Sequence, residues 1–531
     1  MSGAWTPQHQ KEKLLPALPS DNLFTFLRAR FPANPDKAFL IEPDRRTWSY
    51  GDAVEQSARL ANLFVSLGVA PGDRIAVQVE KSAEALMVYL AALRVGAVYL
   101  PLNVAYTSNE VRYFLGDAEP AIFICRPDDE ATMEGIADNA GVRHLISLGT
   151  GGEGTLMALA AGQGDAFEDV ERASDDLAAI LYTSGTTGPA KGAMLTHGNL
   201  RSNAETLREY WRFTAEDRLL HALPIFHTHG LFVATNVTLA AGASMIFLPR
   251  FDAGELVRHM PEATVMMGVP TFYVRLLDRP DFTPDLAAHI RLFVSGSAPL
   301  SAETHKAFRE RTGHAILERY GMTETNMNSS NPYEGERIPG SVGFPLPGIA
   351  LRVTDPETGR VLHRETGVIE VRGPNVFKGY WRRPEKTAED FRPDGFFITG
   401  DLGHIDERGY VFIVGRAKDL IISGGFNVYP AEVEAVIEAL DGVAECAVIG
   451  VPHRDLGEAV VAVVKPVAGA TIEQTGIIAA INDDLARFKQ PRRIVLVDEL
   501  PRNVMGKIQK KELREAYAGL FAPQADAPDA G

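Results

Sequence analysis

Hydrophobic residues occur with two different spacings in the first third of the chain. Segment 82–95 carries apolar residues at helical spacing, whereas 74–79 and 121–125 are short continuous apolar runs. Such runs are typical of strands that are buried on both faces. Helices that alternate with buried strands favour an α/β fold with a largely parallel sheet.

The pattern changes after residue 340 and again after residue 416. Between 340 and 415, short alternating segments are separated by Gly, Pro and Asp, which indicates a β-rich subdomain. Beyond 416 the pattern predicts a compact α+β unit with its own core. The segments expected there are helices at 432–440 and 477–487 and strands at 447–451, 460–464 and 494–497.

These changes predict two parts of unequal size. Residues 1–415 are expected to form a large N-terminal domain of α/β layers plus the β-rich subdomain. Residues 416–531 are expected to form a small C-terminal domain. Its tail from Ala522 is small, acidic and proline-containing, so we expect it to be disordered.

Charge and cysteine content narrow the function. The chain has 531 residues, with 53 Lys and Arg against 69 Asp and Glu, a formal charge of −16. This balance argues against nucleic acid and anionic membranes as partners, although a local cationic pocket can still hold a small anion. Cys125 and Cys446 lie too far apart for a disulfide framework or metal motif. No signal peptide or membrane-spanning run is visible, so we expect a cytoplasmic protein.

A glycine-rich loop carries the strongest local signal. The apolar run 177–181 predicts a buried strand, and it leads into 182–192, YTSGTTGPAKG. Its glycines let the backbone approach a polyanion, and its hydroxyls and lysine can bind phosphate oxygens. The Walker pattern is excluded because Gly192 follows Lys191. The residues expected to contact phosphate are Thr183, Ser184, Gly185, Thr186, Thr187, Gly188 and Lys191.

Four further motifs follow the loop in order. They are ERYGMTE at 318–324, TGD at 399–401, GRAKD at 415–419 and PRNVMGK at 501–507. This ordered set resembles the acyl-adenylate-forming superfamily of acyl-CoA synthetases, nonribosomal-peptide adenylation domains and firefly-type luciferases. The resemblance implies an enzyme that activates a carboxylic acid with ATP and Mg²⁺, and then passes the acyl group to CoA.

The resemblance also implies a nucleotide site. Asp401 would accept both ribose hydroxyls, Arg416 would reach the same ribose, and Tyr320 would stack against adenine. A β-turn aspartate beside a surface arginine is the structural alternative for the first two. The remaining residues that we expect to contact ATP are Ser297, Ala298, Pro299, Glu318, Arg319, Gly321, Met322, Thr323 and Lys507.

The catalytic residues come from the same comparison. Lys507 would neutralise charge on the α-phosphate and the attacking carboxylate, and Thr323 would add a hydroxyl. Glu324 would hold Mg²⁺, which prefers oxygen ligands. His227 would gate the acid pocket. Its neighbour His229 could suggest a metal site, but the pair lacks carboxylate or cysteine partners.

Two segments of the C-terminal part have conformational roles in similar proteins. Lys418 would lie at the hinge on which the small domain pivots between adenylating and thioester-forming states. Gly424 and Gly425 would flank the pantetheine channel of CoA, or else form a simple turn. Lys507 lies in a glycine-flanked loop, so a lysine acetyltransferase and deacetylase are candidate partners that would switch its charge.

Two arginines bear on the choice of acid. A buried guanidinium needs an anion, so Arg275 or Arg319, with Ser297 and His227, would hold a second substrate carboxylate. Two alternatives stay open at this point: Arg275 on an exposed helix face, or Arg319 paired with Glu318.

Further segments of the chain resemble one branch of this superfamily. Segments 223–231, 268–273, 295–298 and 318–328 resemble the malonate–CoA ligase branch. That branch converts malonate, ATP and CoA into malonyl-CoA, AMP and pyrophosphate through malonyl-AMP. Methylmalonate is a candidate second substrate, because one methyl group is weakly discriminated. Another short carboxylic acid, or a separate carrier protein in place of CoA, remains the alternative.

Overall fold

Two large sheets form the N-terminal part of the computed structural model, which describes residues 20–44, 46–183, 190–423, 426–453, 456–470, 472–482, 484–485, 487–503 and 506–521. In the first sheet the strand order is β18-β8-β7-β4-β3-β5-β6. The strands from β7 to β6 are parallel, whereas β8 and β18 are added antiparallel. The bounds are β3 (Arg74–Gln78), β4 (Val98–Pro101), β5 (Ile122–Cys125), β6 (His144–Ser147), β7 (Leu177–Thr183), β8 (Lys191–Thr196) and β18 (Gly379–Tyr380).

The second sheet has the order β15-β14-β13-β12-β11-β9-β10-β1-β2. Its middle is parallel from β13 to β1, and the strands at both edges are antiparallel. The carboxyl ends of β11, β12 and β13 therefore meet at one edge of the sheet, where ligands of α/β proteins commonly bind. The bounds are β1 (Ala38–Ile41), β2 (Thr47–Ser49), β9 (Arg218–His221), β10 (Ser244–Phe247), β11 (Val265–Gly268), β12 (Leu292–Ser295), β13 (Leu317–Met322), β14 (Asn326–Ser330) and β15 (Phe344–Pro345).

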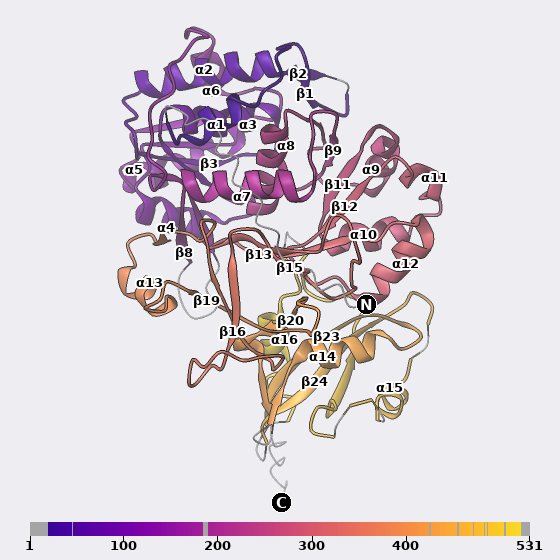
Figure 1. The fold of residues 1–531 in the computed structure, drawn as a ribbon. Coiled ribbons are helices and arrows are strands. Elements are labelled where there is room, and N and C mark those ends of the chain that lie inside the picture. Colours follow the sequence, from indigo (N-terminus) through magenta and orange to yellow (C-terminus); the bar gives the residue numbers. More distant parts are fainter. Residues whose placement is uncertain are drawn as a thin grey trace, which may run out of the picture.

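Helices cover these two sheets, with α2, α3 and α7 seen across the upper half of Figure 1. Helix α3 is apolar almost all round and is buried along its whole length, as expected for a helix enclosed by other layers. The bounds are α1 (Leu23–Arg28), α2 (Tyr50–Ser66), α3 (Ala83–Arg94), α4 (Ser108–Ala118), α5 (Glu130–Asn139), α6 (Thr155–Ala160), α7 (His197–Tyr210), α8 (Asn236–Ala241), α9 (Ala253–His259), α10 (Pro270–Leu277), α11 (Pro284–Ala287) and α12 (Ala302–Thr312).

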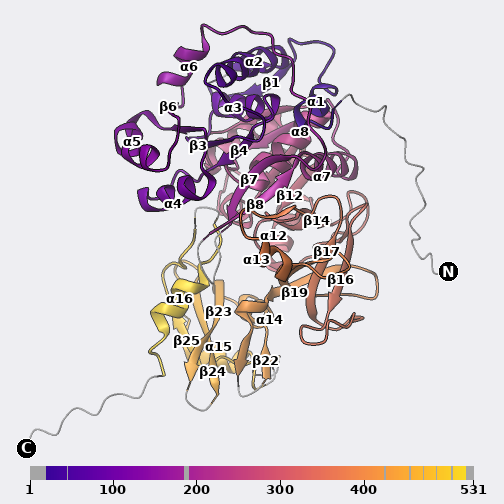
Figure 2. The same ribbon diagram turned by 90° about the vertical axis from the view of Figure 1, so that its left-hand side faces the viewer.

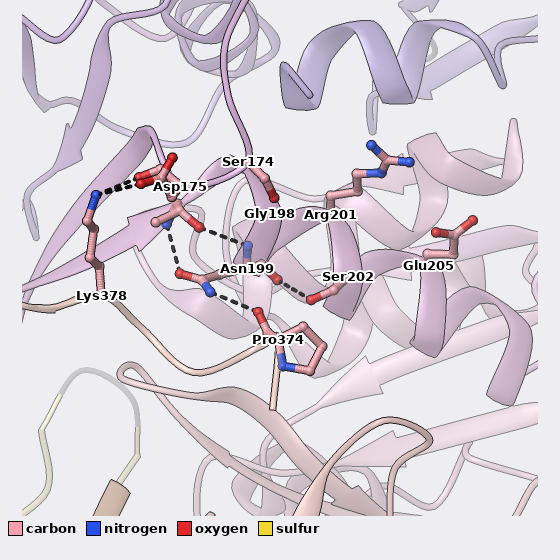
Figure 3. Close-up of a pocket in the computed structure, with 10 residues that line it drawn as sticks. Ser174, Asp175, Gly198, Asn199, Arg201, Ser202, Glu205, Pro374 and Lys378 are labelled. Atoms are coloured by element: carbon pink, nitrogen blue, oxygen red, sulfur yellow. Dashed lines mark hydrogen bonds and ion pairs between the residues drawn. The ribbon is translucent and has the colours of Figure 1, made fainter. Parts of the chain in front are cut away.

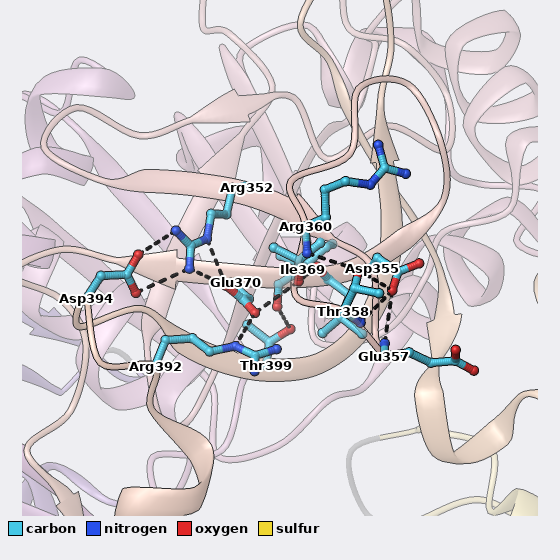
Figure 4. A network of polar contacts seen from close by, with 12 residues as sticks. Arg352, Asp355, Glu357, Thr358, Arg360, Ile369, Glu370, Arg392, Asp394 and Thr399 are labelled. Carbon is cyan, nitrogen blue, oxygen red and sulfur yellow. Dashed lines mark hydrogen bonds and ion pairs between the residues drawn. The ribbon is translucent and has the colours of Figure 1, made fainter.

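A smaller antiparallel sheet, in the order β16-β17-β19-β20, follows in the chain. Its strands are β16 (Ala350–Thr354), β17 (Gly367–Arg372), β19 (Phe397–Ile405) and β20 (Val411–Arg416), and helix α13 (Pro384–Asp390) precedes β19. The buried carboxylate of Glu370 on β17 accepts hydrogen bonds from Arg352 Nε at 2.8 Å, Arg392 Nε at 2.7 Å and Thr354 Oγ1 at 2.9 Å (Figure 4). This network stabilises the sheet through a fully paired internal charge.

The C-terminal part lies at one end of the molecule, below the other layers in both views (Figures 1 and 2). Its sheet has the order β22-β21-β24-β23, with β25 beside β24. Alternate residues of β23 face two separate cores, because successive side chains point to opposite faces of a strand. The bounds are β21 (Ile421–Ser423), β22 (Phe426–Val428), β23 (Val443–His453), β24 (Gly457–Pro466), β25 (Arg493–Leu496), α14 (Pro430–Glu438), α15 (Gln474–Ala480) and α16 (Lys510–Tyr517).

The predicted fold class is confirmed: α/β layers, a β-rich sheet and a smaller α+β C-terminal part. The helix expected at 477–487 differs, since α15 runs over Gln474–Ala480. The chain turns after it, at Asn482 and Asp484, residue types whose side chains compete with helical hydrogen bonds. The tail from Ala522 lies outside the described residues. In the part that the structure describes, no helix is both long and apolar enough to span a bilayer.

Candidate active site

The glycine-rich loop joins two strands of a hairpin. Thr183 at the end of β7 pairs with Lys191 at the start of β8. The predicted phosphate ligands Ser184, Gly185, Thr186, Thr187 and Gly188 lie outside the described residues. The stem is held from α4: the Tyr113 hydroxyl donates to the Ala190 carbonyl at 2.7 Å, and the Tyr182 hydroxyl donates to Asp117 Oδ2 at 2.6 Å. The hairpin is therefore anchored on both strands.

Tyr380, a residue that the sequence analysis did not identify, contacts both Lys191 and Glu324. The Tyr380 hydroxyl donates to Glu324 Oε1 at 3.1 Å, and the Lys191 ammonium lies 4.8 Å from the Tyr380 ring centroid. Burial raises the pKa of Glu324, while the charges of Arg416 and Lys191 and the Tyr380 hydroxyl oppose that rise. Tyr380 is encoded 56 residues after Glu324. No local spacing could have connected the two.

The predicted nucleotide residues Tyr320, Asp401 and Arg416 form one cluster, in which Tyr320 and Asp401 are buried and Arg416 is half-buried. The Tyr320 hydroxyl donates to Asp401 Oδ2, and Arg416 Nε lies 2.6 Å from Asp401 Oδ1. The negative charge of Asp401 raises the pKa of Arg416. Thr399 Oγ1 accepts a hydrogen bond from the Asp401 amide at 3.0 Å, which fixes the backbone at this position. A carboxylate has about four acceptor positions, so Asp401 retains capacity for ribose hydroxyls.

Lys507 reaches this cluster from the C-terminal part. Asp401, Arg416 and Asp419 all influence its pKa, which is lowered chiefly by partial desolvation, although the residue is exposed. Its amide donates to Asn503 Oδ1 at 3.0 Å, closing a tight turn. The charge of Lys507 also contributes to lowering the pKa of His227 to about 4, an effect due mainly to burial. Lys507 therefore lies within electrostatic range of both the Asp401 cluster and His227, and its catalytic role stays a prediction.

The predicted hinge residue Lys418 follows β20 in a short 3₁₀ turn, Ala417–Asp419, and is exposed. Its neighbour Asp419 accepts a hydrogen bond from Arg514 of α16 at 2.9 Å. This contact ties the connection between the two parts to the C-terminal helix. Gly424 and Gly425, expected at the CoA channel, lie outside the described residues.

Arg319 on β13 is the most unusual charge in the cleft. Its side chain is 4% exposed, and its Nε and Nη2 atoms have no hydrogen-bond partner in the described part of the chain. Burial lowers the pKa of Arg319 to about 9. The guanidinium lies against Gly296, where a Cβ atom would come within 2.4 Å of its Cζ. Only glycine leaves room for this side chain.

Glu318 does not neutralise Arg319. Neighbouring residues of a strand point to opposite faces, and Glu318 Oε1 instead accepts a hydrogen bond from the Gly340 amide at 3.1 Å. Burial raises the pKa of Glu318 to about 8. Among the ion pairs of the described residues, none joins Glu318 to Arg319. The pairing that the sequence left open is not formed.

His229 is the second functional residue that sequence reasoning missed. It begins a π-helix, His229–Thr235, a conformation that is frequent at functional sites. Its Nδ1 lies 3.2 Å from Ser297 Oγ, its Nε2 has no partner among the described residues, and the charge of Arg319 helps to lower its pKa. Ser297 has a φ of +71°, a strained conformation for a non-glycine residue. His229, Ser297 and Arg319 thus form a cluster of polar groups, in which His229 and Arg319 have nitrogens without partners among the described residues.

Arg275 does not belong to the cluster of His229, Ser297 and Arg319. It is exposed on α10, and its charge acts on Glu499 of the C-terminal part. The expectation of a buried Arg275 is therefore wrong, because the buried face of the helix is formed by Phe272, Tyr273 and Leu276. His227, which was expected beside the substrate carboxylate, is half-buried; Lys507 contributes to lowering its pKa, and His227 in turn helps to lower the pKa of His229.

The remaining predicted residues surround these groups. Thr323 lies in the turn between β13 and β14, and it is half-buried. Gly321 and Met322 end β13. Ala298 and Pro299 follow β12 in the same loop as Ser297. Their direct contacts with a nucleotide stay predictions.

The residues around Glu324 suit a metal ion whose coordination is completed by phosphate oxygens of the substrate. No group of three or more His, Cys, Asp or Glu side chains among the described residues could hold an ion alone. Mg²⁺ commonly binds through one or two carboxylates together with substrate phosphates. A single buried carboxylate beside Lys191 fits that arrangement.

A separate pocket of about 480 Å³ lies over the start of α7 (Figure 3). Its two cations already have partners: Lys378 Nζ lies 3.3 Å from Asp175, and Arg201 Nη1 lies 2.8 Å from Asp21. The cations of this pocket are therefore less available to an anionic substrate than Arg319, which is buried and has nitrogens without partners among the described residues.

Comparisons with known proteins identify the family of the chain. Residues 27–381 match the AMP-binding enzyme family, and residues 432–507 match the AMP-binding enzyme C-terminal domain. The chain is 34% identical to malonate–CoA ligase of Arabidopsis thaliana, covering 94% of this chain and 89% of the relative. It is 36% identical to feruloyl-CoA synthase of an Amycolatopsis species, covering 88% and 94%.

A solved structure, ATP-bound MatB from Rhodopseudomonas palustris, superposes with a TM-score of 0.93 at 56% identity, covering 94% of this chain and 100% of that one. The family match spans more than half of the 531 residues, and the similarity to relatives extends over nearly the whole chain. The chain therefore belongs to the AMP-binding enzyme family.

Proposed function

We propose that this protein is an AMP-forming malonate–CoA ligase. The observation that carries the proposal is the buried guanidinium of Arg319, which lies near His229 and lacks partners for Nε and Nη2. A charge in this state calls for an anion on the ligand. The acid must keep one carboxylate for reaction with ATP, so the second anion is a second carboxylate. The relatives named malonate–CoA ligase and MatB support this choice.

The reaction proceeds in two balanced steps. A malonate carboxylate oxygen attacks the α-phosphorus of ATP, and the bond to pyrophosphate breaks, which gives malonyl-AMP. The CoA thiol then loses its proton and attacks the acyl carbon, forming the thioester and releasing AMP. Lys507 stabilises the negative charge that gathers on the α-phosphate and the carboxylate in the first step.

The other residues bind and orient the substrates. Asp401 and Arg416 hold the ribose, while Lys191 and the glycine-rich loop hold the phosphates. Arg319 binds the distal carboxylate, with His229 and Ser297 as hydrogen-bonding neighbours. Glu324 would hold Mg²⁺, which neutralises phosphate charge when it is bound.

The proposal extends to three further features. The chain divides at residues 415 and 416, and the C-terminal part pivots near Lys418 so that Gly424 and Gly425 can reach CoA in the second step. Acetylation of Lys507 would abolish its charge and with it the first step. Methylmalonate is a second substrate, and the protein works in the cytoplasm.

A second candidate is a ligase for a different carboxylic acid. The similarity to feruloyl-CoA synthase favours it, since a relative with comparable identity is named for a larger aromatic acid. Transfer of the acyl group to a carrier protein is the remaining alternative. Arg319 argues against an apolar or aromatic monocarboxylic acid as the substrate, because such an acid lacks the second anion that the buried guanidinium requires.

Partial reactions test the proposal. Without CoA, malonate should support exchange of pyrophosphate into ATP, and CoA should then yield malonyl-CoA and AMP. In Lys507→Ala, exchange should fall about 10²- to 10³-fold, as for loss of one preorganised charged donor. The same variant should still convert supplied malonyl-AMP to the thioester. Equal loss of both half-reactions would contradict the role of Lys507, and absence of exchange in the wild type would contradict the proposed function.

A further inference from the structure

Tyr380 touches two groups of opposite charge at once. Its hydroxyl donates to Glu324 Oε1 at 3.1 Å, and the face of its ring carries the Lys191 ammonium at 4.8 Å from the centroid. A tyrosine ring attracts a cation through its negative face, while its hydroxyl can donate to an anion. One side chain therefore serves both the proposed metal-binding carboxylate and the proposed phosphate-binding lysine.

The position of Tyr380 is itself fixed. It pairs with Ala193 in the short ladder between β18 and β8, and its amide donates to Thr387 Oγ1 at 2.9 Å. Its ring packs against Phe377 with centroids 4.9 Å apart. Because β8 begins with Lys191, the strand that carries the lysine also holds the tyrosine on which that lysine rests.

Tyr380 lies against both charged groups, which do not pair with each other. The charge of Lys191 acts on the buried Glu324, yet no ion pair within 4.0 Å joins Lys191 to Glu324 among the described residues. A direct pair in this setting would be strong, since water screens it little. It would also occupy the groups that MgATP needs, so a spacer between them has a functional consequence.

We propose that Tyr380 is a positioning residue for MgATP, which holds Lys191 away from Glu324 and thereby reserves the carboxylate for Mg²⁺ and the ammonium for phosphate. The inference rests on the proposed function only in that the cleft binds MgATP. Carboxylates that bind metals are commonly oriented by a hydrogen bond from a neighbouring side chain. Here that bond comes from a residue that also controls the nearest cation.

The test measures nucleotide binding by calorimetry on the full-length protein, without acid or CoA. Tyr380→Phe keeps the ring and removes the hydroxyl. Its Kd for MgATP should rise about tenfold, the lower limit seen when a residue that orients a metal ligand is lost. Its Kd for ATP in EDTA should stay unchanged, because Lys191 still rests on an aromatic ring.

Two further variants make the test decisive. Tyr380→Leu removes the ring as well, so Lys191 is free to pair with Glu324, and the Kd for metal-free ATP should also rise. Tyr113→Phe is the matched control: it removes a hydroxyl bonded to the Ala190 carbonyl at the same hairpin, without touching either charge. It should leave the ratio of the two Kd values unchanged.

The outcomes separate this inference from the proposed function. Equal weakening of both forms of ATP in Tyr380→Phe, or no change in either, would overturn the role of Tyr380 while the ligase proposal stands. Failure of the wild type to bind ATP at all would overturn both.

Discussion

Two buried charges in this protein have opposite surroundings. Glu370 of the small antiparallel sheet is 0% exposed and accepts hydrogen bonds from Arg352, Arg392 and Thr354. Arg319 of β13 is 4% exposed, and two of its nitrogens have no partner in the part of the chain that the structure describes. The first charge is complete within the fold, whereas the second is complete only when something else binds.

The difference shows how a structural charge can be told from a functional one. Removing a charge from water costs several kcal/mol, which close counter-charges and hydrogen bonds offset. The fold supplies that compensation to Glu370 and withholds it from Arg319. Nearby, His229 has an unpartnered Nε2 and Ser297 has a strained backbone, so unfavourable features gather where substrate is expected.

The largest effect on stability is expected from Glu370. Glu370→Gln leaves Arg392 without its carboxylate and Arg352 with Asp394 alone, so the free energy of unfolding should fall by about 1–3 kcal/mol. Urea denaturation measures this loss. The kcat/KM for malonate should be unchanged in the fraction that remains folded, and a selective loss of activity without destabilisation would contradict the comparison.

Arg319 should behave in the opposite way. In Arg319→Met the kcat/KM for malonate should fall by about 10²-fold or more, as when one partner of a buried charge pair is truncated. The free energy of unfolding should hold or rise, since an uncompensated buried charge is removed. Steady-state kinetics and urea denaturation of the same preparation provide both values. A strongly destabilised variant with normal malonate kinetics would place Arg319 with Glu370 as a structural charge.

The smallest effect is expected from His229. His229→Gln should raise the KM for malonate about fivefold, the equivalent of about 1 kcal/mol for one hydrogen bond. His305→Gln is the matched control: His305 is also buried, but its Nε2 contacts the Ile316 backbone carbonyl and it has no contact with Ser297 or Arg319 among the described residues, so the variant should leave KM unchanged. Equal KM values in the two variants would contradict a role of His229 in binding the acid.

Sequence alone predicts the features that short segments encode. The strand before the glycine-rich loop is confirmed as β7. Of the motif residues, Tyr320 and Arg416 contact Asp401 directly, and Lys507 lies within range of its charge. A motif specifies its own backbone and residue types, and these fix much of the site.

Sequence could not predict how side chains from distant segments pair. Arg275 and Arg319 look alike as isolated arginines, yet one is exposed and the other buried, because helix α10 turns Arg275 outward. His229 and His227 are two residues apart, and the π-helix decides which of them reaches Ser297. Tyr380 gains its role only from the packing of β18 on β8.

The comparison of malonate with its monomethyl ester tests the central claim most directly. The two acids have nearly the same shape around the reacting carboxylate, but the ester lacks the second negative charge. If Arg319 recognises that charge, pyrophosphate release by the wild type should show a kcat/KM about 10²-fold higher for malonate. Equal values for the two acids, or a preference for the ester, would contradict the account.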